Sequence, residues 1–316
     1  MITTITPETE SQWLEMRKLD VTSTEVSALF GLSPYLTKFE LWHLKKGLLD
    51  SSFEATERTE WGLALQDAIA AKIAAERGWK IRRKDEYARL PTLRAGASFD
   101  FEILEAEDPE DVGALIEVKN VDALVFRASW TKEDGATMAP DHIELQVQQQ
   151  LMLSARKRAY IVVLVGGNKA HVLRRDIDAD IVSAITASIQ EFWQSIEAEQ
   201  PPAPDYPSDA SAVQRLFGRA EPGKQIDADT ETSELIETHY RLGEQERRLS
   251  EARDVLKSMI LERIQDAETA KCQIGDRIYT VSAGLIAPAE IAFTRAGYRN
   301  FRITNAAAKK PKEKAA

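Results

Sequence analysis

Cysteine is almost absent from this sequence of 316 residues, in which Cys272 is the single one. One cysteine excludes a disulfide framework, a cysteine-rich zinc site and a four-cysteine iron–sulfur cluster. Long apolar runs are also missing, because the longest one, at 159–165, is far shorter than the roughly 20 residues of a transmembrane helix. The first residues show no basic stretch followed by an apolar one, which a secretory signal requires. We therefore expect a cytoplasmic protein with no membrane partner.

Positive charge is in deficit, since 41 Lys and Arg residues face 51 Asp and Glu residues and leave a formal net charge of −10. Net charge bears on solubility, however, and leaves a local nucleic-acid site open. The basic residues gather in three short segments, 80–84, 156–158 and 309–314. With 43% hydrophobic and 29% charged residues, the chain can bury a core, which excludes global disorder.

The apolar pattern of residues 1–200 predicts helices and strands that alternate along the chain. Helices are expected at 24–30, 39–46, 61–77, 143–154 and 178–199, and strands at 80–83, 95–103, 114–118, 159–165 and 172–175. Gly78 is the expected C-cap of the third helix. This order of elements predicts one α/β domain with a mixed sheet.

Beyond residue 200 the composition changes. Prolines predict an extended linker over 201–226, and 227–305 is predicted to hold a long helix at 230–267 and a small hairpin at 271–282. Leucines recur every seven residues in the helix, which is the period of a coiled coil, although Thr238 and Gln245 between them are polar. The helix could dock on the first domain or associate with a second copy of itself, and both alternatives are open. The basic tail, 306–316, is expected to be disordered.

Two carboxylates and an amine form the most informative pattern in the chain. Glu117 and Lys119 are two residues apart, so on a strand both side chains project to the same face, and Asp100 lies near the end of another apolar strand. Two carboxylates and the backbone carbonyl of Val118 are oxygen ligands of the kind that Mg²⁺ prefers. Lys119 would then orient the attacking water or stabilise developing negative charge. By spacing alone, a surface salt bridge is the alternative.

Several further motifs lie in a consistent order around this pattern. They are Trp13-x-x-x-Arg17, residues 22–26, 29–37 and 40–42, Trp61-Gly62, Ser98-x-Asp100, Glu117-Val118-Lys119, and 140–148 with Gln146. Over about residues 10–200 they resemble the lambda-exonuclease/YqaJ-type phage recombination nucleases, a branch of the PD-(D/E)xK superfamily.

The resemblance implies a restriction-endonuclease-like core at 1–200, a central mixed sheet flanked by helices, with a C-terminal helical extension. It implies a Mg²⁺-dependent exonuclease, with Mn²⁺ as a substitute metal, that degrades duplex DNA from 5′ ends and leaves 3′ single strands for a single-strand annealing protein. It further implies a homo-oligomer, a ring-shaped trimer in the family, encoded by a phage or prophage in a bacterial host.

The family's site residues carry over position by position. Asp100 and Glu117 become metal ligands, and Lys119 contacts the attacking water. The residues that fall where family members bind phosphate are Arg17, Thr24, Ser98 and Gln146. Guanidinium, hydroxyl and amide groups all donate hydrogen bonds to phosphate oxygens.

One position departs from the family pattern. Gln66 stands where the family usually has a metal-site glutamate, and the neighbouring Asp67 is turned roughly 100° away on a helix. Gln66 can supply an amide oxygen, but the loss of a carboxylate leaves the choice between one and two metals open. Two other functions also stay open: a structure-specific or nicking endonuclease of the same superfamily, and a catalytically decayed DNA-binding scaffold.

Overall fold

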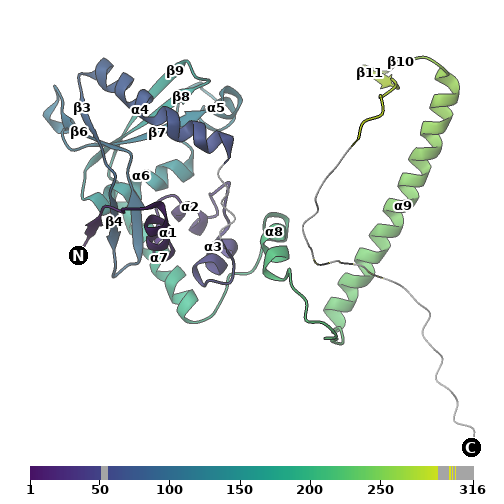
Figure 1. The fold of residues 1–316 in the computed structure, drawn as a ribbon, viewed down its shortest axis with the longest axis horizontal. Coiled ribbons are helices and arrows are strands. Elements are labelled where there is room, and N and C mark those ends of the chain that lie inside the picture. Colours follow the sequence, from purple (N-terminus) through teal and green to yellow (C-terminus); the bar gives the residue numbers. More distant parts are fainter. Residues whose placement is uncertain (51–55, 291–298, 300, 302, 304–316) are drawn as a thin grey trace, which may run out of the picture. The chain divides into compact units, whose positions relative to one another are not determined.

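The computed structural model describes residues 1–50, 56–290, 299, 301 and 303 (Figure 1). The chain divides into two compact units, Met1–Leu216 and Phe217–Ala316. Each unit is described by itself. In the described part of the chain, no helix combines the length and the apolar character that crossing a bilayer requires.

The first unit is built on a five-stranded sheet in the order β3-β6-β7-β8-β9. Its strands are β3 (Lys80–Arg83), β6 (Phe101–Glu105), β7 (Leu115–Val121), β8 (Arg158–Val165) and β9 (Lys169–Asp176). Only the β7–β8 pair is parallel, so the chain must cross over between these two strands, and α6 (Asp141–Ser154) lies in that connection. The sheet is therefore mixed, as the sequence predicts.

Helices cover both faces of this sheet. On one face, α4 (Glu57–Arg77) packs Ile69 and Ile73 against the apolar side chains of β7 and β8, and Gly78 ends the helix at a φ of 67°. On the other face, α6 packs Val147 and Leu151, and α7 (Ala179–Glu197) lies behind it. The predicted fold class, a mixed sheet flanked by helices, is confirmed.

The same packing sets the direction of the polar residues on β7. Ile116 and Val118 belong to the core under α4, whereas Leu115 and Val121 belong to the core under α6. Side chains alternate along a strand, so Glu117 and Lys119 point to the α6 face.

A second, four-stranded sheet, in the order β1-β4-β5-β2, lies beside the first in the same unit. It consists of β1 (Thr3–Ile5), β4 (Tyr87–Leu90), β5 (Ala95–Ser98) and β2 (Val21–Thr22). The expected single strand at 95–103 is thus divided, because β5 belongs to this sheet and β6 to the other. The break falls at Phe99 and Asp100, which places Asp100 at the junction of the two sheets.

Shorter elements complete the unit: α1 (Glu10–Lys18), α2 (Val26–Leu29), α3 (Lys38–Lys45), η1 (Pro109–Asp111), α5 (Ala123–Ser129) and α8 (Tyr206–Leu216). The prediction of a linker over 201–226 is wrong for α8. This helix buries Ala212 against Phe39 and Leu49, and its Asp209 accepts a hydrogen bond from the Thr37 hydroxyl. Pro207 lies in the first turn, where the missing N–H removes no intrahelical hydrogen bond.

The second unit contains α9 (Thr230–Ile264), β10 (Thr269–Ile274) and β11 (Arg277–Ser282). Asp229 caps α9 by accepting a hydrogen bond from the Thr232 N–H at 2.8 Å, and Gly275, at a φ of 62°, lies in the turn of the β10–β11 hairpin. The predicted long helix and hairpin are confirmed. The expected disordered tail, 306–316, lies outside the described residues.

Candidate active site

Glu117 is the centre of the polar cluster on β7, and both of its carboxylate oxygens are engaged. Oε1 accepts hydrogen bonds from Gln146 Nε2 at 2.7 Å and from Lys119 Nζ at 2.6 Å, while Oε2 accepts one from Gln150 Nε2 at 2.7 Å. Lys119 Nζ also donates to the Gln146 amide oxygen at 3.2 Å. Glu117 and Gln146 are buried, so the cluster fixes the carboxylate in one orientation.

Asp100 reaches the same strand through a hydrogen bond to the backbone. Its Oδ2 accepts from the Val118 N–H at 2.8 Å, just before β6 begins. Burial raises the pKa of Asp100 to about 7, and the charge of Glu117 adds to the rise, against the opposing effects of Lys119, the Val118 N–H and a hydrogen bond with Gln66. The carboxylate is therefore costly to ionise without a further positive charge.

Lys119 supplies the amine of this cluster. Burial lowers its pKa, but the charges of Glu117 and Asp100 outweigh that effect, so the net shift is upward. The ammonium form therefore persists at neutral pH. Two acidic side chains face this single ammonium group, which leaves an excess of negative charge. A bound divalent cation would compensate that excess.

A second group of polar side chains comes from α1 and the β2–α2 turn. Arg17 donates to the Thr24 hydroxyl at 3.1 Å, and its guanidinium lies 4.6 Å from the centre of the Trp13 ring. The Trp13 indole N–H in turn donates to the Ser98 hydroxyl at 2.9 Å. The structure thus brings together Arg17, Thr24 and Ser98, with Trp13 in contact with both Arg17 and Ser98.

Gln150 joins the two groups, and sequence reasoning missed it. Its Nε2 donates both to Glu117 and to the Ser98 carbonyl oxygen, the latter at 3.0 Å. The side chain is 2% exposed. The available signal was its spacing, since residues four apart on a helix share a face and Gln146 was already a candidate.

Gln66 lies on α4 at the far side of Asp100. Its amide oxygen accepts from Arg83 at 3.3 Å, and it forms the hydrogen bond that lowers the pKa of Asp100. Asp67 is exposed and pairs with Arg83 at 2.6 Å. Arg83 therefore engages both side chains, and Asp67 does not join the cluster on β7.

The donor set fits a hard cation with few protein ligands. In the described ranges, no three Asp, Glu, His or Cys side chains gather into a metal-binding group. Two carboxylates, the Val118 carbonyl, the Gln66 amide and water are oxygen donors, and Mg²⁺ characteristically keeps several waters next to one or two carboxylates. The arrangement can therefore hold one such ion beside the Lys119 amine.

Fold and site together define a mixed α/β domain with an Asp, Glu-x-Lys cluster at the junction of two sheets. Residues 12–157, which contain this cluster, match the family model of the YqaJ-like viral recombinase domain. This match agrees with the resemblance that the sequence motifs predicted.

The chain is also similar to individual proteins. The uncharacterized protein YqaJ of Bacillus subtilis (strain 168) is 29% identical over 263 residues, which cover 81% of this chain and 79% of that protein. Among solved structures, the alkaline exonuclease LHK-Exo from Laribacter hongkongensis overlays with a TM-score of 0.44 and 16% identity, over 64% of this chain and 98% of that chain. A phage-related exonuclease from Haemophilus somnus 129PT overlays with a TM-score of 0.38 and 12% identity, over 57% and 96% of the respective chains.

Proposed function

We propose that this chain is a Mg²⁺-dependent nuclease that degrades duplex DNA from its 5′ ends. The observation that carries the proposal is the Glu117–Lys119–Gln146 cluster beside Asp100, within the segment that matches the viral recombinase family.

Asp100 and Glu117 are the proposed carboxylate ligands, with the Val118 carbonyl and the Gln66 amide as further oxygen donors. When bound, Mg²⁺, or Mn²⁺ in its place, would polarise the scissile phosphate and lower the pKa of a coordinated water. Gln146 and Gln150 hold the Glu117 carboxylate in place, and the Lys119 ammonium orients the water and stabilises the negative charge that develops on the phosphate.

Arg17, Thr24 and Ser98 are the proposed phosphate site. Arg17 and the two hydroxyls are donors, and the Gln150 bridge ties Ser98 to the Glu117 carboxylate. A phosphate held there would place the neighbouring phosphodiester near the acidic pair. This supports attack at a 5′ end. From the family resemblance we also propose that the remaining 3′ strand passes to a single-strand annealing protein and that the chain acts as a homo-oligomer in a bacterial host.

Digestion of linear duplex DNA with different labels at its 5′ and 3′ ends, with and without Mg²⁺, tests the proposal. We expect Mg²⁺-dependent loss of the 5′ label first, and no cutting by Lys119→Ala when circular dichroism shows that this variant is folded. Covalently closed circular duplex should stay intact. Cutting of the circle would instead identify an endonuclease, and equal inactivity of wild type and Lys119→Ala on all ends would favour a DNA-binding scaffold.

A further inference from the structure

The long helix of the second unit has no buried residue. All 35 residues of α9 are at least partly exposed, and a glycine, Gly243, lies in its interior. Helices in proteins draw most of their stability from packing of an apolar face, and an interior glycine costs roughly 1 kcal/mol relative to alanine. A helix of this length is therefore expected to pack against something.

Four leucines mark the face that is left open. Leu235, Leu242, Leu249 and Leu256 follow one another at intervals of seven residues and are 65%, 59%, 67% and 57% exposed. We call them the leucine stripe. A strict seven-residue repeat follows the contact line between two supercoiled helices, whereas packing on a globular surface follows the 3.6-residue turn. The expected occupant of the stripe is therefore another helix.

We propose that the leucine stripe is the contact between α9 and the α9 of a second copy of this chain, with the two helices parallel and in register. A stripe that repeats every seven residues is complementary to itself when the copies are aligned. Positions three residues after the leucines are Thr238, Gln245, Ala252 and Met259. The first three are smaller or more polar than leucine, so the pairing should be moderate in strength and easily weakened by one substitution.

Charges beside the stripe favour the parallel arrangement. In a parallel pair, the residue before a leucine approaches the residue four positions after the equivalent leucine of the other copy. Arg241 thereby meets a second copy's Glu246, and Val255 meets a second copy's Ile260; only Arg248 and Arg253 repel. An antiparallel pair that aligns all four leucines would instead place Glu246 against its own equivalent and Arg241 against Arg248.

Contacts within the unit leave most of this face available, although Leu256 lines a hollow together with Val281 and Gly284. Arg247 forms ion pairs with Glu244 at 3.0 Å and with Glu251 at 3.8 Å. Arg241 and Glu246 form no ion pair among the described residues. Phe301 lies edge-on to His239, with ring centres 5.3 Å apart, near the beginning of the stripe. Leu242 and Leu249 nevertheless keep most of their surface exposed.

The test compares the mass of the full-length chain, measured by sedimentation over a range of concentrations. We expect Leu242→Glu with Leu249→Glu to abolish association through α9, and Ile236→Glu, an apolar residue of the same helix that is 41% exposed and off the stripe, to have little effect. Arg241→Glu should weaken association by about 10-fold, and the further change Glu246→Arg should restore it. An unchanged mass with Leu242→Glu and Leu249→Glu, or no rescue in the charge-reversed pair, would overturn the proposal.

Cross-linking reads the same contact independently of any association through the first unit. In a Cys272→Ser background, Leu249→Cys should form a disulfide between two copies under mild oxidation, because equivalent residues face each other only in the parallel, in-register pair. Efficient cross-linking only when Leu242→Cys protein is mixed with Leu249→Cys protein would show an antiparallel pair and contradict the proposal. Neither readout requires nuclease activity, so the failure of the proposed function would leave this inference standing.

Discussion

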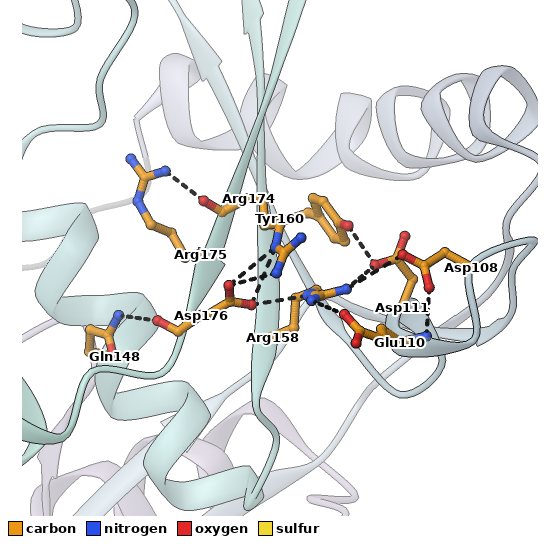
Figure 2. A network of polar contacts seen from close by, with 9 residues as sticks. All are labelled: Asp108, Glu110, Asp111, Gln148, Arg158, Tyr160, Arg174, Arg175 and Asp176. Carbon is orange, nitrogen blue, oxygen red and sulfur yellow. Dashed lines mark hydrogen bonds and ion pairs between the residues drawn. The ribbon is translucent and has the colours of Figure 1, made fainter.

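Two polar clusters at the five-stranded sheet differ in how their charges are balanced. At the start of β8, Arg158 donates to Asp111 at 2.8 Å, to Glu110 at 2.8 Å and to Asp176 at 3.0 Å, as Figure 2 shows. We call this set the Arg158 network. The other cluster lies farther along, where Glu117 and Lys119 pair with Ile161 and Val163 of β8, and its two acidic side chains share one ammonium group.

The pKa values show the difference. Burial alone would raise the pKa of Asp111, but hydrogen bonds from Tyr160 and Arg158 outweigh it and the net shift is downward. The pKa of Asp100 instead rises to about 7, mainly through burial. A carboxylate whose hydrogen-bond donors lower its pKa stabilises the fold. A buried carboxylate whose pKa is raised is unfavourable in its charged form, which indicates a site that binds a further cation.

The largest expected effect separates activity from stability at Asp100. Asp100→Asn keeps an oxygen that can accept from the Val118 N–H but removes the charge. We expect nuclease activity to fall by about 10³-fold or more, and the free energy of unfolding to stay the same or rise. Digestion assays and urea unfolding at pH 8 measure the two quantities. If Asp100→Asn kept its nuclease activity, or clearly lost stability, Asp100 would not differ from the stabilising carboxylates of the Arg158 network.

The Arg158 network should respond in the opposite way. Arg158→Met leaves Asp111 without its ion partner, and we expect the free energy of unfolding to fall by about 2–4 kcal/mol while the activity of the folded fraction is unchanged. Arg174→Met is the matched control, because Arg174 is half exposed and pairs only with Asp176. It should cost less than about 1 kcal/mol.

Gln150 lies between these extremes, because it holds Glu117, a proposed metal ligand, without being a proposed ligand itself. Gln150→Leu should weaken Mg²⁺ binding by about 10–100-fold, measured by calorimetry on the protein without DNA. Gln148→Leu is its control, since Gln148 is equally buried on α6 but bonds to the Asp176 carbonyl and the Asp178 N–H. If both variants reduced Mg²⁺ affinity alike, Gln150 would have only a general packing role.

The smallest effect concerns acid stability. The pKa of Asp176 is lowered by hydrogen bonds from Arg174 and Arg158, against the effect of burial, and that of Asp111 is lowered as well. Both folded pKa values lie below the ordinary 3.8, so their stabilisation is complete above that pH and is lost as the pH falls below it. Urea unfolding at pH 5 and pH 3 should show a larger loss for wild type than for Arg158→Met. Equal losses would remove the Arg158 network as the cause.

Much of the candidate site could be predicted from local sequence. Glu117 and Lys119 share a face because a strand repeats every two residues, and the apolar residues around them already indicated a buried strand. Gln146 followed from its place in a familiar order of motifs. The helix α8 could not be predicted in the same way, because its proline-rich start resembles a linker and its helical state depends on Ala212 burying against α3.

Contacts between distant segments account for the remainder. Gln150 is one of several polar residues on α6, and only the approach of α6 to β7 and β5 gives it Glu117 and Ser98 as partners. Likewise, the break between β5 and β6 depends on which sheet each half joins. Local periodicity thus determined the main helices and strands of the first sheet, the direction of the β7 side chains and the seven-residue stripe of α9. Tertiary structure alone decided where the chain breaks at Asp100 and which side chains balance its charge, because burial and partners are properties of packed segments and not of any one of them.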